Sequence, residues 1–165
     1  MSSKRAGITL AFGIICLSQA AQAVSHHGGI CTSYAGGDEK FFHHTQSGVI
    51  NADAQGHYVT CPLSRTTEEL YGATILVNIE HSLQQTTKCT AYSYPSTGVP
   101  PLASISEEWK GKGFHEFNLK INGYGKSSAT STYSVWCFLG SGAKIYGLDL
   151  KEHKKPTLPG HGQPH

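Results

Sequence analysis

Histidines are the residues of this 165-residue chain best suited to hold a metal ion or to move a proton, and there are ten of them. Two adjacent pairs occur, His26-His27 and His43-His44. Adjacent side chains on a strand face opposite ways, so neither pair offers two ligands on one face. No H-x-H sequence is present. Ordinary exposed polar positions are therefore the main interpretation of these histidines.

One histidine has a more defined coordination chemistry. If a leader peptide is removed after Ala23, the new terminus reads Val24-Ser25-His26. Its free amine, two deprotonated backbone amides and the imidazole of His26 would supply four nitrogens in one plane, a square-planar set that suits Cu(II) or Ni(II). Histidine reaches the third position by chance as well, so metal binding here is an alternative function.

Aromatic rings offer a second binding chemistry, because Tyr and Trp join a flat apolar ring to a polar group. The rings that could contact a sugar or an apolar ligand are Tyr92, Tyr94, Trp109, Tyr124 and Trp136. We expect Trp109 to be exposed, because it stands beside Lys110-Gly111-Lys112-Gly113, and Trp136 to lie in the core. The alternative for each ring is core packing or cross-strand pairing.

Motifs of hydrolases are missing, since the sequence has no G-x-S-x-G, H-E-x-x-H, P-loop or G-x-G-x-x-G. A hydrolase remains an alternative if His57 or His81 meets an acid such as Glu80 in a pocket that perturbs its pKa. The main prediction is a binding or structural protein without catalytic residues and without a required cofactor.

Residues 1–23 have the features of a secretory signal peptide. Lys4 and Arg5 precede an apolar run over 6–17, and Ala21-Gln22-Ala23 offers small residues for cleavage. The run is shorter than the roughly 20 residues that span a bilayer as a helix. We therefore expect a secreted or periplasmic protein with no membrane insertion after cleavage.

Cleavage would also change the cysteine count and the charge. Cys16 would leave, so that four of the five cysteines remain, and these are widely spaced: Cys31, Cys61, Cys89 and Cys137. Two structural disulfides are expected in an oxidising compartment. Three pairings are possible, and Cys31–Cys61 with Cys89–Cys137 is favoured because each would join neighbouring candidate strands.

Charge argues against one class of partner. Without Lys4 and Arg5, eleven of the thirteen Lys and Arg remain against eleven Asp and Glu, a formal net charge of zero with His neutral. The lysines are interleaved with acids and glycines rather than gathered in a stripe. Nucleic-acid binding is therefore not expected.

Strand signals dominate the chain after the leader. Short runs of Val, Ile, Thr, Tyr and Phe are separated by turn residues at intervals of roughly 8 to 12 residues, which is typical of an all-β sandwich or barrel. We predict one antiparallel β-sandwich, jelly-roll-like or Ig-like, over 30–151. A flexible segment, 24–29, would precede it, and a disordered tail, 152–165, would follow it.

Two details of the strands are predicted as well. The run 133–139 is apolar on both faces apart from Ser134, which indicates a central strand covered on both sides. Gly140-Ser141-Gly142 then favours a hairpin with the strand over 145–150. Edge strands of the sandwich leave self-association by strand addition open.

Several strand motifs occur together in a fixed order. They are Cys31-Thr32-Ser33-Tyr34, Gly48-Val49-Ile50-Asn51, Tyr58-Val59-Thr60-Cys61-Pro62-Leu63, Cys89-Thr90-Ala91-Tyr92-Ser93, Tyr133-Ser134-Val135-Trp136-Cys137 and Ile145-Tyr146-Gly147. With its V-x-C-P-L and Y-S-x-x-C elements, the chain resembles an uncharacterised family of small exported bacterial proteins. The resemblance implies an exported, disulfide-linked β-sandwich and brings no catalytic residue with it.

Overall fold

The computed structural model describes residues 23–65, 71–122 and 130–153. Its strands are β1 (Ala23–His27), β2 (Thr32–Ser33), β3 (Phe42–Thr45), β4 (Gly48–Asn51), β5 (His57–Leu63), β6 (Gly72–Tyr94), β7 (Ala103–Asn122), β8 (Thr132–Leu139) and β9 (Ala143–Glu152). Two short 3-10 turns, η1 (Gly28–Ile30) and η2 (Glu39–Phe41), accompany them. No helix in these ranges is long and apolar enough to cross a membrane.

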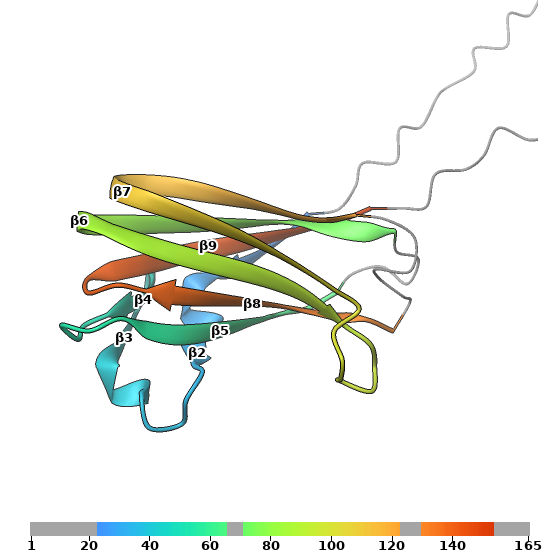
Figure 1. Cartoon of the computed structure of the whole chain (residues 1–165), viewed down its shortest axis with the longest axis horizontal. Helices are drawn as coiled ribbons and strands as arrows, with labels where there is room; N and C mark the ends of the chain where they lie inside the picture. Colours follow the sequence, from blue (N-terminus) through green and yellow to red (C-terminus); the bar gives the residue numbers. More distant parts are fainter. Residues whose placement is uncertain (1–22, 66–70, 123–129, 154–165) are drawn as a thin grey trace, which may run out of the picture.

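A long hairpin of β6 and β7 connects the two layers of the molecule (Figure 1). The β6–β7 register shifts between His81 and Gln85, and the hairpin bends back on itself there. On β7 the bend contains Gly113, whose φ of 98° lies in the region that favours glycine. The first part of β6 pairs with β9 and the second part with β8, so one hairpin belongs to both layers.

Two antiparallel layers result from this bend, and the predicted all-β sandwich is confirmed. The β8 layer contains β2, β5, β8, the second part of β6 and the first part of β7. The β9 layer contains the other parts of β6 and β7 together with β9, β1, β4 and β3.

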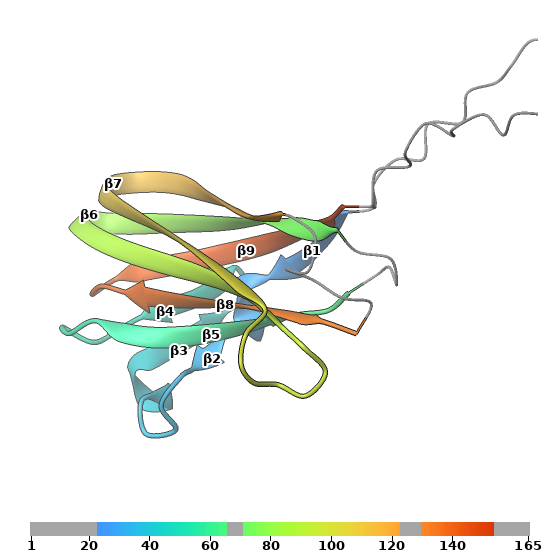
Figure 2. The ribbon, with the colours of Figure 1, turned by 45° about the vertical axis from the view of Figure 1, so that its right-hand side comes forward.

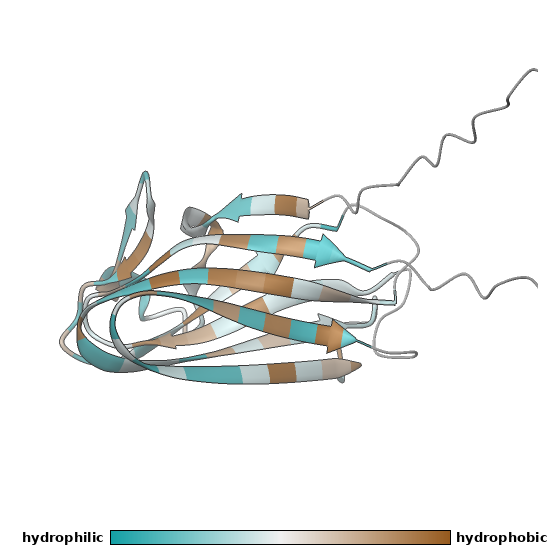
Figure 3. Cartoon of the chain, turned by 90° about the horizontal axis from the view of Figure 1, so that it is seen from above, coloured by the Kyte–Doolittle hydropathy of each residue, from teal (hydrophilic) through white to brown (hydrophobic). Residues whose placement is uncertain are grey.

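Apolar and polar residues alternate along the strands (Figure 3). The apolar residues are the buried ones, so the core lies between the layers. On β8 the buried side chains are those of Tyr133, Val135, Cys137 and Leu139. Their neighbours Ser134, Trp136 and Phe138 are only half-buried. The prediction that β8 is covered on both faces is therefore wrong: it is central, but its outer face is open.

Both disulfides are present in the core. Cys31–Cys61 ties the residue before β2 to β5, and Cys89–Cys137 joins directly opposed residues of β6 and β8. The Cα atoms are 4.1 Å apart in each pair, and all four cysteines are fully buried. The two predicted disulfides are confirmed, with the pairing that the sequence favours.

Three other predictions need correction. The segment 24–29 is not loose, because β1 pairs with β9 from Ala23 opposite Lys151 to His27 opposite Gly147 (Figure 2). β8 and β9 do not form a hairpin, because both pair with β6 but with parts of it that belong to different layers. The turn over 140–142 therefore leads from one layer to the other. The predicted disordered tail, 152–165, starts too early, because Glu152 is the buried last residue of β9 and the His153 N–H donates to the Gly72 carbonyl at 3.0 Å. The predicted signal peptide up to residue 22, Tyr124 and the tail from residue 154 lie outside the described residues.

Candidate ligand-binding groove

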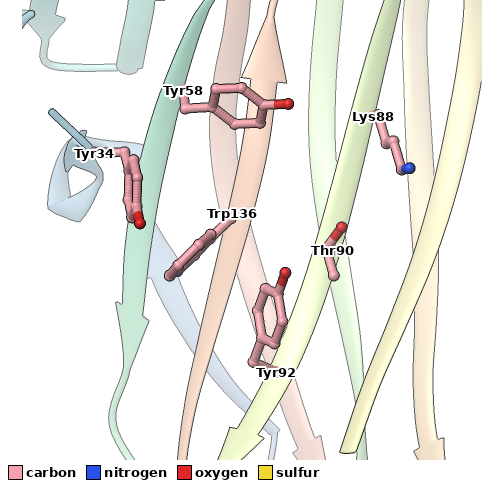
Figure 4. A pocket seen from close by; sticks show the side chains of 6 residues that line it. All are labelled: Tyr34, Tyr58, Lys88, Thr90, Tyr92 and Trp136. Carbon is pink, nitrogen blue, oxygen red and sulfur yellow. The ribbon is translucent and has the colours of Figure 1, made fainter. Parts of the chain in front are cut away.

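A groove with a volume of about 330 Å³ lies on the outer face of the β8 layer (Figure 4). Six side chains line this outer groove: Tyr34, Tyr58, Lys88, Thr90, Tyr92 and Trp136. Small-molecule sites typically measure about 300 to 1,000 Å³ and are mainly apolar with a few polar groups. The outer groove has both properties.

Strand register gathers these side chains on one face. Trp136 on β8 stands opposite Thr60 on β5 and Thr90 on β6. Since side chains alternate along a strand, Lys88, Thr90 and Tyr92 share this outer face, while Cys89 and Ala91 between them are fully buried. The disulfide through Cys89 therefore fixes the strand pair that forms the floor of the groove.

Trp136 is the centre of the aromatic set. Its ring centroid lies 4.4 Å from that of Tyr34, at an interplanar angle of 46°, and 5.0 Å from that of Tyr92, at 53°. These spacings are those of interacting aromatic pairs, which fix one another's orientation. Tyr34 remains 54% exposed and Tyr58 51% exposed, so two of the four rings offer wide contact surface to a ligand.

Polar groups accompany the rings. In Figure 4 the side chains of Thr90 and Lys88 lie to one side of Trp136, with Tyr58 above and Tyr92 below it. Thr90 shares a hydrogen bond of 2.8 Å between its hydroxyl oxygen and that of Ser106 on β7. The tyrosine hydroxyls and the Lys88 ammonium group add further donors to the apolar surface. The arrangement can therefore stack against a flat ligand and hydrogen-bond to its rim.

Tyr34 lies on a loop that backbone and side-chain contacts hold in place. Its backbone N–H donates to the carbonyl of Tyr58 at 2.9 Å. Immediately before it, the Ser33 N–H donates to the Glu39 carboxylate at 2.8 Å, and the same carboxylate contacts the His44 imidazole at 2.7 Å. The Ser33 backbone bond and the His44 contact lower the pKa of Glu39. One wall of the outer groove is thus held by a carboxylate and a histidine.

A second histidine, His57 on β5, contacts the same loop between β2 and β3 through Asp38. The Nε2 atom of His57 lies 2.6 Å from Asp53, and its Nδ1 atom lies 3.2 Å from Asp38. The hydrogen bond to Asp53, and after it the one to Asp38, raises the pKa of His57, and the same bond lowers the pKa of Asp53. We call these three residues the His57 clamp. Both ring nitrogens are engaged by carboxylates, so the imidazole holds structure rather than offering a free base.

The predicted ligand-binding rings are only partly brought together. Tyr92 lines the outer groove, whereas Tyr94 stacks on Tyr92 with a centroid distance of 5.6 Å without lining it. Burial, followed by the neighbouring Tyr92 and Tyr34, raises the pKa of Tyr94. Trp136, expected in the core, is the central ring of the groove.

Trp109 occupies the opposite environment to the one predicted. It pairs with the buried Thr87, so its indole turns inward and packs against the core. His81 lies 4.4 Å from it and His115 4.7 Å, the latter at an interplanar angle of 7°. The indole also covers Gly111, where an added Cβ would meet it at 2.5 Å. Gly111, which has no Cβ, thus leaves room for the indole to pack at the bend, where the sequence predicted an exposed ring.

The hydrolase alternative required His57 or His81 to meet an acid such as Glu80 in a pocket. His57 does meet two acids, Asp53 and Asp38, but it does not line the outer groove. His81 contacts a backbone carbonyl and a hydroxyl instead of an acid. The carboxylate of Glu80 accepts a hydrogen bond from the hydroxyl of Tyr146. His81 donates from Nδ1 to the Gly111 carbonyl at 2.9 Å, which leaves Nε2 to accept from the Thr87 hydroxyl at 2.8 Å. Burial lowers the pKa of His81.

The predicted metal-binding terminus lies within β1. Ser25 and His26 are extended and opposite Asp149 and Leu148 of β9, so four nitrogens could meet in one plane only if β1 left the sheet. Across the described ranges, no group of three or more His, Cys, Asp or Glu side chains is placed to hold a metal ion. Metal binding at Val24-Ser25-His26 stays a prediction.

Alternation could have pointed to part of the groove from the sequence. Lys88, Thr90 and Tyr92 alternate with Cys89, Ala91 and Ser93, so a buried cysteine predicts that the other three point outward. Tyr58 has the same signal, because it alternates with Val59 and Cys61. Tyr34 had no comparable signal, because it reaches Trp136 only through the pairing of β2, β5 and β8.

Comparison with known proteins adds a fold similarity. No protein-family model matches the sequence, and a search of curated proteins finds no match. The structure is similar to the CBM36-1 domain of a multidomain xylanase from the hindgut metagenome of Trinervitermes trinervoides, with a TM-score of 0.50 and 8% identity over 81% of this chain and 100% of that chain. A second structure, a carbohydrate-binding module, CBM36, in complex with calcium and xylotriose, has a TM-score of 0.47 and 15% identity over 78% of this chain and 99% of that chain. At such identity the first similarity establishes the β-sandwich fold alone.

Proposed function

We propose that this protein binds carbohydrate without catalysing a reaction, and that the outer groove is the binding site. The observation that carries the proposal is Trp136, held between Tyr34 and Tyr92 at the floor of an open groove. A sugar ring has an apolar C–H face and a rim of hydroxyl groups. Aromatic faces next to hydroxyl donors therefore complement both parts of it.

Three further features support this proposal. The fold is similar to that of the CBM36-1 domain of a multidomain xylanase. The two buried disulfides suit an oxidising compartment outside the cytoplasm, where extracellular polysaccharides are met. The histidines that a hydrolase would need have both ring nitrogens engaged in structural contacts.

The experiment compares binding of a saccharide panel to three forms of the protein. The panel contains neutral trisaccharides (xylotriose, cellotriose and mannotriose) and acidic ones (trigalacturonate and trimannuronate), measured by isothermal titration. The variants are Trp136→Ala, which removes the central ring of the groove, and Phe114→Ala. Phe114 is 73% exposed on β7 in the β9 layer, so its loss is a matched aromatic deletion outside the groove.

We expect at least one trisaccharide to bind, and Trp136→Ala to weaken it by about 2 kcal/mol, or roughly thirtyfold, the size typical of a central aromatic contact. Phe114→Ala should bind like the original protein. Absence of binding to every member of the panel would contradict the proposed function, as would binding that both variants weaken equally.

A further inference from the structure

The outer groove has a positively charged side and an aromatic side. One side is made of rings, and the other contains Lys88, the one charged residue among the described side chains that line the groove. Lys88 is exposed on β6, two positions from Thr90 and four from Tyr92, and Trp136 lies on the neighbouring strand, β8 (Figure 4). A saccharide stacked on Trp136 would therefore extend its rim toward an ammonium group.

The positive charge of Lys88 is not neutralised by a contact. No ion pair of Lys88 is present among the described residues. Its cross-strand neighbours are Phe138 on β8 and Glu108 on β7, which is exposed. The register places Glu108 directly opposite Lys88 on the same outer face, so this acid is the nearest cross-strand charge, although it forms no ion pair with Lys88 and is not part of the groove lining.

From this arrangement we infer that the preferred ligand is an acidic saccharide, one that carries a carboxylate or a sulfate group, seated with that group at Lys88. The inference rests on the proposed function and adds the class of sugar to it. Hydrogen bonds between an ammonium group and an anion are roughly twice as strong as neutral ones. Lysine recognises an anion as a point charge, so carboxylate and sulfate satisfy the same chemistry.

Thr90 and the tyrosine hydroxyls favour an acidic sugar over a small free anion as the ligand. The Thr90 hydroxyl is positioned by Ser106, between Lys88 and the rings. A bare anion would contact Lys88 alone, at an exposed position where solvent and salt weaken the attraction. A sugar that bears the anion adds stacking on Trp136 and hydrogen bonds to the hydroxyls.

The test uses ligands that differ in charge but hardly in shape. Trigalacturonate and trimannuronate are each compared with their methyl esters, which keep the sugar and remove the negative charge. A sulfated galactose trisaccharide and its desulfated form make the second arm. Lys88→Gln removes the charge of the groove, Lys88→Arg keeps it, and Glu108→Gln removes the flanking acid. Circular dichroism checks that each variant is folded.

We expect one acidic trisaccharide in either arm to bind about tenfold more tightly than its uncharged form. Lys88→Gln should abolish that difference, Lys88→Arg should keep most of it, and Glu108→Gln should increase affinity for the acid about twofold. The arm that shows the preference identifies carboxylate or sulfate as the group recognised.

Failure of this inference is distinguishable from failure of the proposed function. If neutral trisaccharides bind through Trp136 as tightly as acidic ones, the inference is wrong and the proposed function stands. A preference for acids that survives Lys88→Gln overturns the inference in the same way. If no saccharide of either charge binds, both are wrong.

Discussion

The two tryptophans lie in two regions with different surroundings, the outer groove and the bend of the β6–β7 hairpin. Trp136 lies on the outer face of β8, between two tyrosines and open to the groove. Trp109 lies on the inner face at the bend of β6 and β7, between two histidines and against the core. The flanking sequence suggests the reverse for each. Strand register, which sets the face that each side chain occupies, decides the environment.

The polar partners of the two regions differ as well. Around the groove, His57 is bound by two carboxylates, which favour its charged form. At the bend, His81 is buried and bound by a carbonyl and a hydroxyl, and burial favours its neutral form. The polar partners near the groove thus favour a charged ring, and those at the bend favour a neutral ring in the interior.

Trp109→Ala should have the largest effect on stability. The indole fills the bend and covers Gly111, so its removal leaves a cavity where the two layers join. We expect the free energy of unfolding to fall by about 3 kcal/mol. Urea denaturation measures this loss, and the saccharide affinity of the folded variant should be unchanged. A loss below about 1 kcal/mol would mean that Trp109 is not part of the core.

Trp136→Ala should reverse this pattern. Its indole contacts Tyr34 and Tyr92 but leaves the buried face of β8 intact, so the free energy of unfolding should fall by only about 1 kcal/mol. The increase in melting temperature that a given saccharide concentration produces should become much smaller, as the roughly thirtyfold weaker binding requires. A stability loss as large as that of Trp109→Ala would show that the two regions do not differ.

The two histidines should give opposite dependences of stability on pH. The pKa of His57 is raised. Its ionised ring therefore contributes fully to the free energy of unfolding below the ordinary pKa of 6.5, and this contribution is lost as pH rises through the raised pKa. The contribution of Asp53, whose pKa is lowered, is present above the ordinary value of 3.8 and is lost as pH falls through the lowered one. The His57 clamp is therefore most stabilising between these two ordinary values. The pKa of His81 is lowered. Its neutral ring therefore contributes to the free energy of unfolding above pH 6.5, and this contribution is lost as pH falls through the lowered pKa.

Chemical denaturation from about pH 5 to pH 9 tests this contrast. The stability lost in His57→Gln should be greater at the acidic end, and that lost in His81→Gln greater at the alkaline end. Parallel profiles for the two variants would contradict the assignment of charged and neutral rings.

Tyr58→Phe should have the smallest effect. It removes one hydroxyl from the groove and leaves the ring, which is tilted against Phe138 at a centroid distance of 5.0 Å. We expect about threefold weaker saccharide binding, the loss of one hydrogen bond, with unfolding unchanged. Titration calorimetry is sensitive enough to detect this. Stronger binding would mean that the hydroxyl obstructs the ligand.

Alternation and spacing were sufficient to predict the sandwich and its disulfides, because these depend on local patterns and on neighbouring strands. Ile75, Val77 and Ile79 alternate with polar residues in the sequence, and all three are fully buried. The bend of the long hairpin could not be predicted in the same way, since it depends on which half of β6 pairs with β8 and which with β9. The position of Trp109 and the groove follow from that bend and from strand register.

The central claim is that Trp136 is the ring that a saccharide contacts, and its own fluorescence tests this most directly. The chain has two tryptophans, so Trp109→Phe leaves Trp136 as the single reporter while keeping an aromatic ring at the bend. This variant would be titrated with each trisaccharide of the panel. We predict a saturable change in emission with the midpoint that calorimetry gives for the same saccharide. Binding seen by calorimetry without any change in Trp136 emission would contradict the account.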